Sequence, residues 1–139
     1  KVHRMAEMTI EWMKIIQVKN PALYAEAKLE LFVEPWDSGQ DRIARGAPCV
    51  ILACAPKEER TAPPAAMIAI HQIQLAAPGL GLGTTFTGSI NTAAQGYPPL
   101  IEMIGLQEGY IPHATCVIGY PAEKYQRIPV RKPVDVMWI

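Results

Sequence analysis

Residues 78–88, PGLGLGTTFTG, hold four glycines in eleven positions and are the stretch of this chain with the most obvious capacity to bind a ligand. Glycine-rich loops bind dinucleotide phosphates when G-x-G-x-x-G follows a strand and opens a helix. That fingerprint needs a glycine three positions after Gly81 or Gly83, where Thr84 and Phe86 stand instead. The residues alone therefore argue against a dinucleotide loop, and a helix end followed by an edge strand explains the glycines without any ligand.

The cysteine and histidine side chains show no spacing typical of a metal site or of a disulfide framework. The three cysteines are odd in number, and the three histidines are scattered without an i,i+4 pair. Cys49 and Cys54 are five residues apart, which places them on opposite faces of a strand. We predict buried free thiols, no disulfide framework and no metal site.

Composition narrows the classes of function. A chain of 139 residues, 50% hydrophobic, is long enough for a single domain over residues 1–139. Its 13 acidic and 13 basic residues balance, so the chain lacks the excess of positive charge that is typical of nucleic-acid-binding proteins. The apolar run 62–82 is interrupted by His71, Gln72 and Gln74, which argues against a membrane span. Without a visible secretory signal, we expect a cytoplasmic protein.

Helical spacing and strand patterns then give the elements that must position residues 78–88. A helix of about 17 residues is predicted from Val2 until Asn20-Pro21 stops it. Further helices are predicted over residues 22–33, 63–77 and 92–104, the last interrupted at 96–98, with a loop over 34–41 and one more helical turn over 41–45. Strands are predicted over residues 48–56, 84–88 and 113–120, and the tail 125–139 should run extended.

Two of these elements are unusually apolar. The run 48–56, PCVILACAP, is continuously apolar between prolines, which predicts a central strand covered on both faces. The helix 63–77 is apolar almost all round, so it should be buried on most sides, either in the core or against another subunit. Helices interspersed with a few strands predict a sheet with helices on both faces.

Several short motifs follow one another in an order that resembles a known family. They are QLAA at 74–77, GLGT at 81–84, FTG at 86–88, GLQEGYIP at 105–112 and GYP at 119–121. Together, over residues 63–133, they resemble the flavin-dependent nitroreductase family. The stretch 125–131, with a tryptophan near the chain end, looks most like the branch fused to ferredoxin-type iron–sulfur modules, although the three cysteines here cannot form such a module.

The resemblance implies a fold and an activity. The fold would be α+β, a three-layer α/β/α arrangement with a central mixed, mainly antiparallel sheet and a buried central helix, here truncated at the N-terminus. The activity would be that of an FMN-dependent oxidoreductase, which passes two electrons from NADH or NADPH through the flavin to a nitroaromatic, a quinone or a similar acceptor. The family also implies a homodimer, with helix 63–77 packed across the interface.

The resemblance also assigns site residues. Phe86, Thr87, Gly88 and Ser89 match the family's flavin-contacting segment, where glycines allow close approach to the ring. Arg131 falls at a basic position that binds the flavin phosphate, although a solvated tail charge remains an equal alternative. No side chain is assigned a catalytic role, because electron transfer through a flavin needs no nucleophile or base from the protein.

One departure from the family leaves a second hypothesis open. The N-terminal phosphate-binding turn and the serine and asparagine segment of family members have no match in residues 1–47. We therefore expect the chain to represent the C-terminal portion of such an enzyme. The alternative is a flavin-binding or dimerising remnant without turnover, because a one-sided site loses contacts and preorganisation.

Overall fold

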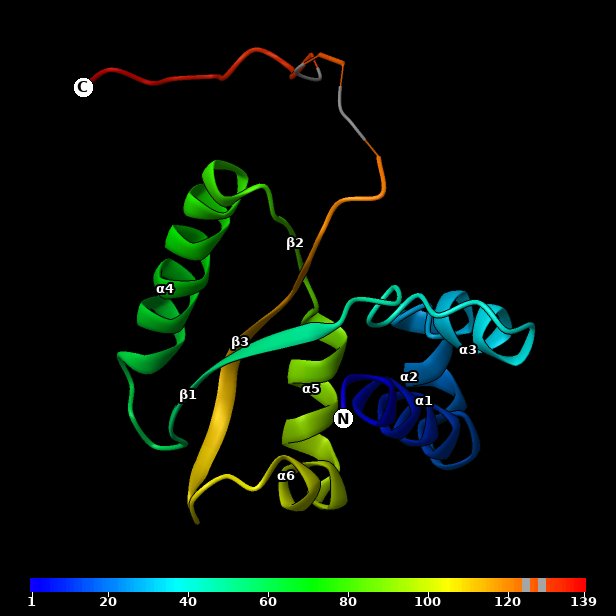
Figure 1. Cartoon of the computed structure of the whole chain (residues 1–139). Coiled ribbons are helices and arrows are strands. Elements are labelled where there is room, and N and C mark those ends of the chain that lie inside the picture. Colours follow the sequence, from blue (N-terminus) through cyan, green and yellow to red (C-terminus); the bar gives the residue numbers. More distant parts are fainter. Residues whose placement is uncertain (124–125, 128–129) are drawn as a thin grey trace.

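The computed structural model describes residues 1–123, 126–127 and 130–139. Its helices and strands alternate along the chain (Figure 1). In order they are α1 (Val2–Lys19), α2 (Pro21–Glu26), α3 (Glu30–Asp37), β1 (Cys49–Pro56), α4 (Ala62–Ala76), the short 3₁₀ helix η1 (Ala77–Leu80), β2 (Gly83–Phe86), α5 (Gly88–Gly96), α6 (Pro98–Ile104) and β3 (Tyr110–Gly119).

The three strands form one antiparallel sheet in the order β1-β3-β2. The strand predicted at 48–56 is confirmed as β1, but its predicted central place is wrong, because in the described sheet β3 lies in the centre and β1 at an edge. The continuous apolar pattern of β1 reflects helices that cover both faces of the sheet, which an edge strand needs as much as a central one. An apolar run therefore indicates covered faces and not a position in the sheet.

A β-bulge interrupts the pairing of β1 with β3. Ala53 pairs with Ala114 and Cys54 with Pro112, so His113 is an extra residue on β3. A proline has no N–H to donate to a ladder and is tolerated inside a sheet chiefly at bulges. Pro112 thus accounts for the irregularity at this point of the central strand.

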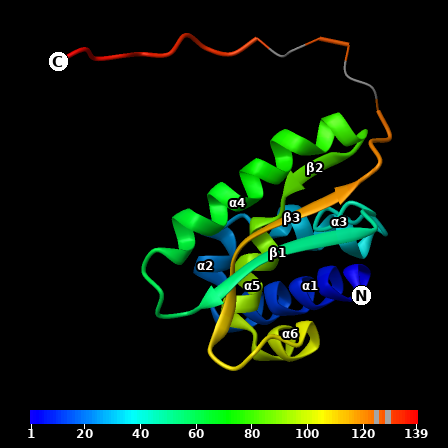
Figure 2. The ribbon, with the colours of Figure 1, turned by 60° about the vertical axis from the view of Figure 1, so that its left-hand side comes forward.

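Helices cover the two faces of the sheet (Figures 1 and 2). Ala66 and Ile70 of α4 pack with Ala114 and Cys116 of β3 on one face. Val117 points to the opposite face, as alternation along a strand requires, and packs in a cluster with residues of α1 and α5.

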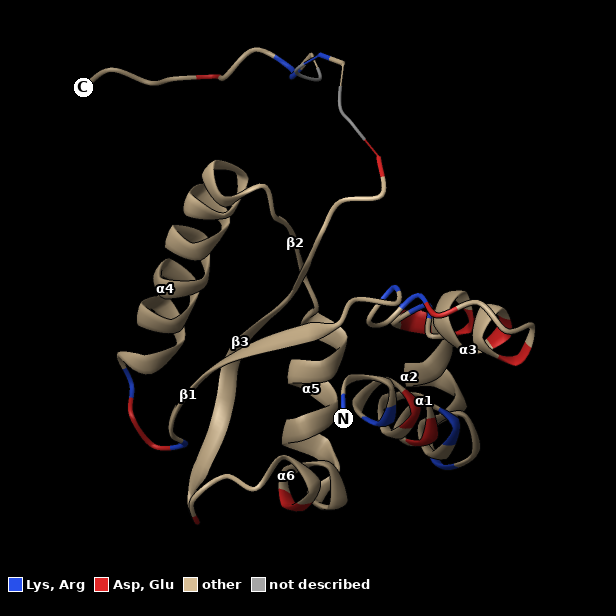
Figure 3. Cartoon of the chain, viewed as in Figure 1, with Lys and Arg blue, Asp and Glu red and all other residues tan. Residues whose placement is uncertain are grey.

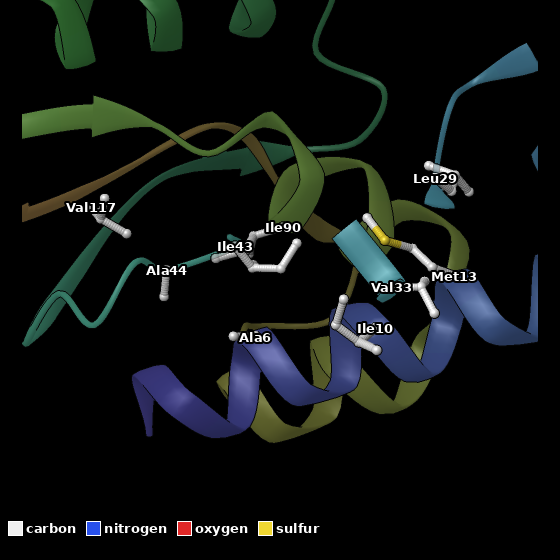
Figure 4. Packing of buried hydrophobic residues seen from close by; sticks show 9 residues of the cluster. All are labelled: Ala6, Ile10, Met13, Leu29, Val33, Ile43, Ala44, Ile90 and Val117. Carbon is white, nitrogen blue, oxygen red and sulfur yellow. The ribbon is translucent and has the colours of Figure 1, made fainter. Parts of the chain in front are cut away.

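The largest buried cluster lies on the α1 and α5 side of the sheet (Figure 4). The cluster contains residues of α1, α3, α5, the loop before β1 and the central strand β3. It therefore packs together segments from most of the chain. Its members are Ala6, Ile10, Met13, Leu29, Val33, Ile43, Ala44, Ile90 and Val117.

The first helix is confirmed, since α1 spans Val2–Lys19. Asn20 separates it from α2 and caps the second helix, because its Oδ1 accepts a hydrogen bond from the Leu23 N–H at 3.1 Å. Pro21 occupies the first helical position, where its missing N–H costs nothing. The sequence signal at Asn20-Pro21 therefore ends one helix and begins another.

The single helix predicted over 22–33 is two helices in the structure. Lys28 takes a φ of 52°, in the left-handed region, and this interrupts the helix between α2 and α3. The loop predicted from residue 34 is also wrong at its start, because α3 continues through Pro35 to Asp37. A proline inside a helix deprives the carbonyl four residues earlier of its donor. Here that carbonyl, on Leu31, accepts a hydrogen bond from Arg42 Nη1 at 3.4 Å.

The helical turn predicted over 41–45 does not form. Asp41 instead organises a loop, with its Oδ1 accepting from the N–H groups of Ile43 at 2.8 Å and Ala44 at 2.9 Å, and its Oδ2 from Gly46 at 3.3 Å. The bond to Gly46 takes the N–H that a helix would join to the Arg42 carbonyl, and a side-chain acceptor competes in this way with a helical backbone bond. The loop then leads into β1.

Helix α4 matches the prediction in extent, and within this chain it is buried along one side. Its buried residues Ala62, Ala66 and Ile70 form one stripe at i, i+4 and i+8. Ile68 and Leu75, on the opposite side, are 61% and 63% exposed. Within this chain the helix is thus covered along one side alone, and of the two alternatives for its apolar surface the core accounts for that side.

The glycine-rich stretch ends α4 and returns the chain to the sheet. Gly81 takes a φ of 71°, which closes η1 and favours glycine over any other residue. The strand predicted over 84–88 is shorter, since β2 ends at Phe86 and Gly88 already belongs to α5. The predicted interruption near residues 96–98 is confirmed by the boundary between α5 and α6, and the strand predicted at 113–120 is confirmed as the longer β3.

The described residues of the tail, 126–127 and 130–139, contain no helix or strand, in keeping with an extended segment. Tyr125, Ile128 and Pro129, which the same prediction included, lie outside the described residues. Trp138 and Ile139 are fully or almost fully exposed. No helix in the described part of the chain has both the length and the apolar character that crossing a membrane would take.

Candidate functional site

Four of the five residues that the sequence analysis singles out, Phe86 to Ser89, lie where β2 turns into α5, and we call residues 86–89 the β2–α5 junction. Phe86 pairs with Cys116 of β3, so its side chain lies on the face of the sheet that α4 covers. The Phe86 ring is nevertheless 42% exposed. The junction therefore presents an aromatic ring to solvent beside a covered sheet face.

Thr87 turns the other way and is 4% exposed. Its N–H donates to the Thr115 carbonyl at 3.0 Å, and its hydroxyl donates to Thr115 Oγ1 at 3.0 Å. The Thr115 hydroxyl in turn donates to the Thr87 carbonyl at 2.6 Å. Since these bonds occupy the polar groups of Thr87, its contribution to a site is to fix the backbone of the junction and not to touch a ligand with its hydroxyl.

The first turn of α5 is left without a cap because the Thr87 hydroxyl is engaged with Thr115. Among the residues that the structure describes, the N–H groups of Gly88 and Ser89 have no hydrogen-bond acceptor. A helix N-terminus also carries partial positive charge. A Cβ placed on Gly88 would meet no atom within 4 Å, so the backbone there is open to approach. This end of α5 can donate hydrogen bonds to a ligand's oxygen or nitrogen atoms.

Asn91 is a polar residue near the junction that the sequence analysis missed. It follows Thr87 by four residues and precedes Gln95 by four, so the three form one polar stripe along α5. Gln95 Nε2 donates to the Pro112 carbonyl at 3.4 Å, whereas the buried Asn91 Oδ1 has no partner in the described chain. The sequence signal that could have found Asn91 is the i,i+4 spacing of Thr87, Asn91 and Gln95.

The strands and helices that form and flank the junction carry no formal charge (Figure 3). No Lys, Arg, Asp or Glu occurs in β1, β2, β3, α4 or α5. Charged residues lie instead on the first three helices, on α6, in the loops and on the tail. An uncharged, partly apolar setting with free backbone donors suits a planar heteroaromatic group better than a polyanion.

Arg131 is not brought to the junction within this chain. It is exposed and belongs to the described tail segment 130–139. In both ribbon views the tail runs past the end of α4 that leads into β2, away from the β2–α5 junction (Figures 1 and 2). The structure thus groups Phe86, Thr87, Gly88 and Ser89, while the role of Arg131 stays a prediction.

The hydrogen bonds between Thr87 and Thr115 should make a measurable contribution to stability. We expect Thr115→Val to lower the free energy of unfolding by about 1–3 kcal/mol, because it leaves the buried Thr87 hydroxyl without an acceptor. The double variant with Thr87→Val should recover part of that loss, since both polar partners are then gone. Urea unfolding of the four proteins measures the coupling, and strictly additive losses would contradict it.

Comparisons with known proteins indicate one family. The model of the Nitroreductase family matches residues 1–120, which begins earlier than the motifs at 63–133 and stops before Arg131. No curated protein matches the chain.

Solved structures share the fold. A nitroreductase with bound FMN from Bacteroides fragilis superposes with a TM-score of 0.68 at 16% identity, over 97% of this chain and 68% of that one. A nitroreductase with bound FMN from Desulfitobacterium hafniense gives 0.64 at 20% identity, over 96% and 70%. A nitroreductase-like protein from Bacillus cereus gives 0.54 at 19% identity, over 95% and 63%. With the family model covering most of its length and an antiparallel sheet of the same fold, the chain belongs to the Nitroreductase family.

Proposed function

We propose that the chain binds FMN at the β2–α5 junction and acts as an oxidoreductase of the nitroreductase type. The observation that carries the proposal is the uncapped start of α5, where the N–H groups of Gly88 and Ser89 are free and the Gly88 backbone is open. The oxidised ring of FMN offers oxygen and nitrogen acceptors along one edge. The similar structures from Bacteroides fragilis and Desulfitobacterium hafniense were both solved with FMN bound. The donors present therefore fit the group.

Each residue of the junction has a distinct task in this proposal. Gly88 and Ser89 would donate backbone hydrogen bonds to the ring edge, and Phe86 would cover part of the ring and exclude water. Thr87 would hold these groups in place through Thr115. Arg131 would bind the phosphate, from the tail of the same chain or of a partner. When bound, FMN supplies two-electron redox chemistry between NADH or NADPH and an acceptor such as a nitroaromatic or a quinone.

A homodimer is part of the same proposal. The outer side of α4 and the end of the tail expose apolar side chains that a second copy would cover. The residues concerned are Met67, Ile68, Leu75, Val134, Val136, Met137, Trp138 and Ile139. The finer family features, namely the three-layer arrangement of the complete enzyme and the ferredoxin-fused branch, belong to the proposal too.

Flavin binding and turnover test the proposal directly. Purified protein that is mixed with FMN and then freed of unbound FMN by gel filtration should keep the visible absorbance of a bound flavin, and NADPH or NADH added without oxygen should bleach it. Binding without bleaching would favour the remnant without turnover. Protein that is colourless after the unbound FMN has been removed would rule out both activity and flavin binding for this chain.

Gly88→Val locates the site. A Cβ at Gly88 meets no other part of the chain within 4 Å, so we expect the fold to be kept, while the larger side chain blocks the approach to the α5 backbone. We expect the Kd for FMN to rise by about tenfold or more, equivalent to roughly 1.4 kcal/mol. Gly79→Val is the matched control, because Gly79 is also an open, exposed glycine but lies in η1, away from the junction. Equal affinities in the two variants would contradict the assignment.

A further inference from the structure

The loop between α3 and β1 forms a second candidate site that the β2–α5 junction does not use. Four side chains, from Gln40, Asp41, Arg42 and Arg45, line a surface cavity of about 400 Å³. Three of the four carry a formal charge, and two of those are guanidinium groups. A concave surface with two arginines is suited to binding an anion.

The loop is held firmly in place. Its side chains at Ile43 and Ala44 are 2% and 1% exposed and belong to the main buried cluster, in which Ile43 lies beside Ile90 (Figure 4). From the surface side, the Asp41 carboxylate binds three backbone N–H groups of the same loop. Arg42 and Arg45 flank the two anchored residues, so their backbone positions are fixed before any ligand arrives.

The two guanidinium groups have no acidic partner. The ion pairs in the described part of the chain join Arg4 to two glutamates and Lys14 to Asp37, and none involves Arg42 or Arg45. Asp41 lies in the same cavity, but its oxygens are taken up by the backbone N–H groups. Two positive charges and one negative charge leave the cavity with a net charge of +1.

Hydrogen-bond donors remain free on both arginines. Arg42 uses Nε for the Gln40 side chain at 3.1 Å and Nη1 for the Leu31 carbonyl at 3.4 Å. A guanidinium has five N–H donors, so three remain for a ligand while the side chain is held by the other two. No hydrogen bond occupies the guanidinium of Arg45 within the described residues.

Arg45 also adopts a backbone conformation that disfavours its own side chain. Its φ is 56°, in the left-handed region, where a residue other than glycine costs about 1 kcal/mol or more. Glycine would relieve this strain at no cost in contacts within the chain, since the side chain is exposed. The observation that points to a ligand is the free donors of two arginines in the lining of one positively charged cavity.

We infer that the loop 40–46 binds the phosphate group of a small molecule, held between the guanidinium groups of Arg42 and Arg45. The planar donor forks of two arginines match the oxygens of a phosphate, and the cavity has room for a phosphate with a small substituent. Inorganic phosphate and the phosphate of a nucleotide share this chemistry. The inference does not depend on flavin binding at the junction.

The test is an NMR titration of the purified full chain with inorganic phosphate and, separately, with AMP, at constant ionic strength. Saturable shifts of the amide signals of residues 42–46 are expected, with adenosine as the ligand that lacks the phosphate. Tighter binding of AMP than of phosphate would identify a nucleotide as the natural source, and equal binding would identify the free anion. Shifts that never saturate, or shifts that adenosine reproduces, would overturn the inference.

Arg45→Gly separates binding from folding. It should weaken phosphate binding by about tenfold or more, while the midpoint of thermal unfolding stays equal or rises because the strained φ is relieved. Lys28→Gly is the matched control, since Lys28 is exposed, carries the same charge and has a φ of 52°. If Lys28→Gly weakens phosphate binding as much as Arg45→Gly, the effect is general electrostatics and the site is refuted.

Discussion

Ile90→Ala is expected to cost about 2–5 kcal/mol of the free energy of unfolding, because it opens a cavity in the middle of the main buried cluster. Ile90 is 0% exposed and projects from α5 among side chains of α1, the loop before β1 and β3 (Figure 4). A domain of this size is stable by roughly 5–15 kcal/mol in total, so the variant would lose a large part of its margin. Urea unfolding at one fixed protein concentration measures the difference.

The control for this variant is Val18→Ala, which removes methyl groups from an 81% exposed side chain on α1. That change should stay within about 0.5 kcal/mol of the parent protein. If Ile90→Ala also falls within that range, the cluster does not pack as the structure has it. The same variant should loosen the junction, since Ile90 lies two residues after Gly88 in the first turn of α5.

Ile68→Glu is expected to abolish the proposed homodimer. Ile68 is 61% exposed in the single chain and lies on the outer side of α4, which would be covered in the dimer. A carboxylate placed in that apolar interface without a partner should cost about 3 kcal/mol, or roughly a hundredfold in self-association. Sedimentation velocity over a range of protein concentrations measures the change.

Val18→Glu is the matched control, because it makes the same kind of substitution on an exposed aliphatic residue of α1. The control protein should keep the dimer. A parent protein that sediments as a monomer at micromolar concentration would contradict the dimer itself, and equal effects of the two glutamates would place the interface elsewhere than on α4.

Local signals in the sequence predicted most of the elements and failed where side chains take over backbone hydrogen bonds. The helix from Val2 and the strands at 48–56 and 113–120 follow from periodicity and from proline and glycine positions. The helical turn expected at 41–45 does not form, and the Gly46 N–H that it would use binds the side chain of Asp41. The Leu31 carbonyl, which Pro35 leaves without a helical donor, accepts a hydrogen bond from Arg42, eleven residues further along the chain.

The assignment of the candidate site stays a prediction. The family motifs indicated residues 86–89, and the structure places them at the turn from β2 into α5. Pattern alone did not reveal that Thr87 faces inward, because its partner Thr115 is 28 residues away. The position of Arg131 in space could not be predicted either, because the tail has no regular structure from whose register it could be worked out.

The bulge in β3 shapes the central strand without deciding which side chains face the helices. Tyr110–Pro112 pair with Cys54–Pro56 on one side of the extra residue His113, and Ala114 pairs with Ala53 on the other. If His113 were deleted, these pairs would follow one another directly, so each residue would keep its face of the sheet. The strand would lose the local bend and the added twist that a bulge gives.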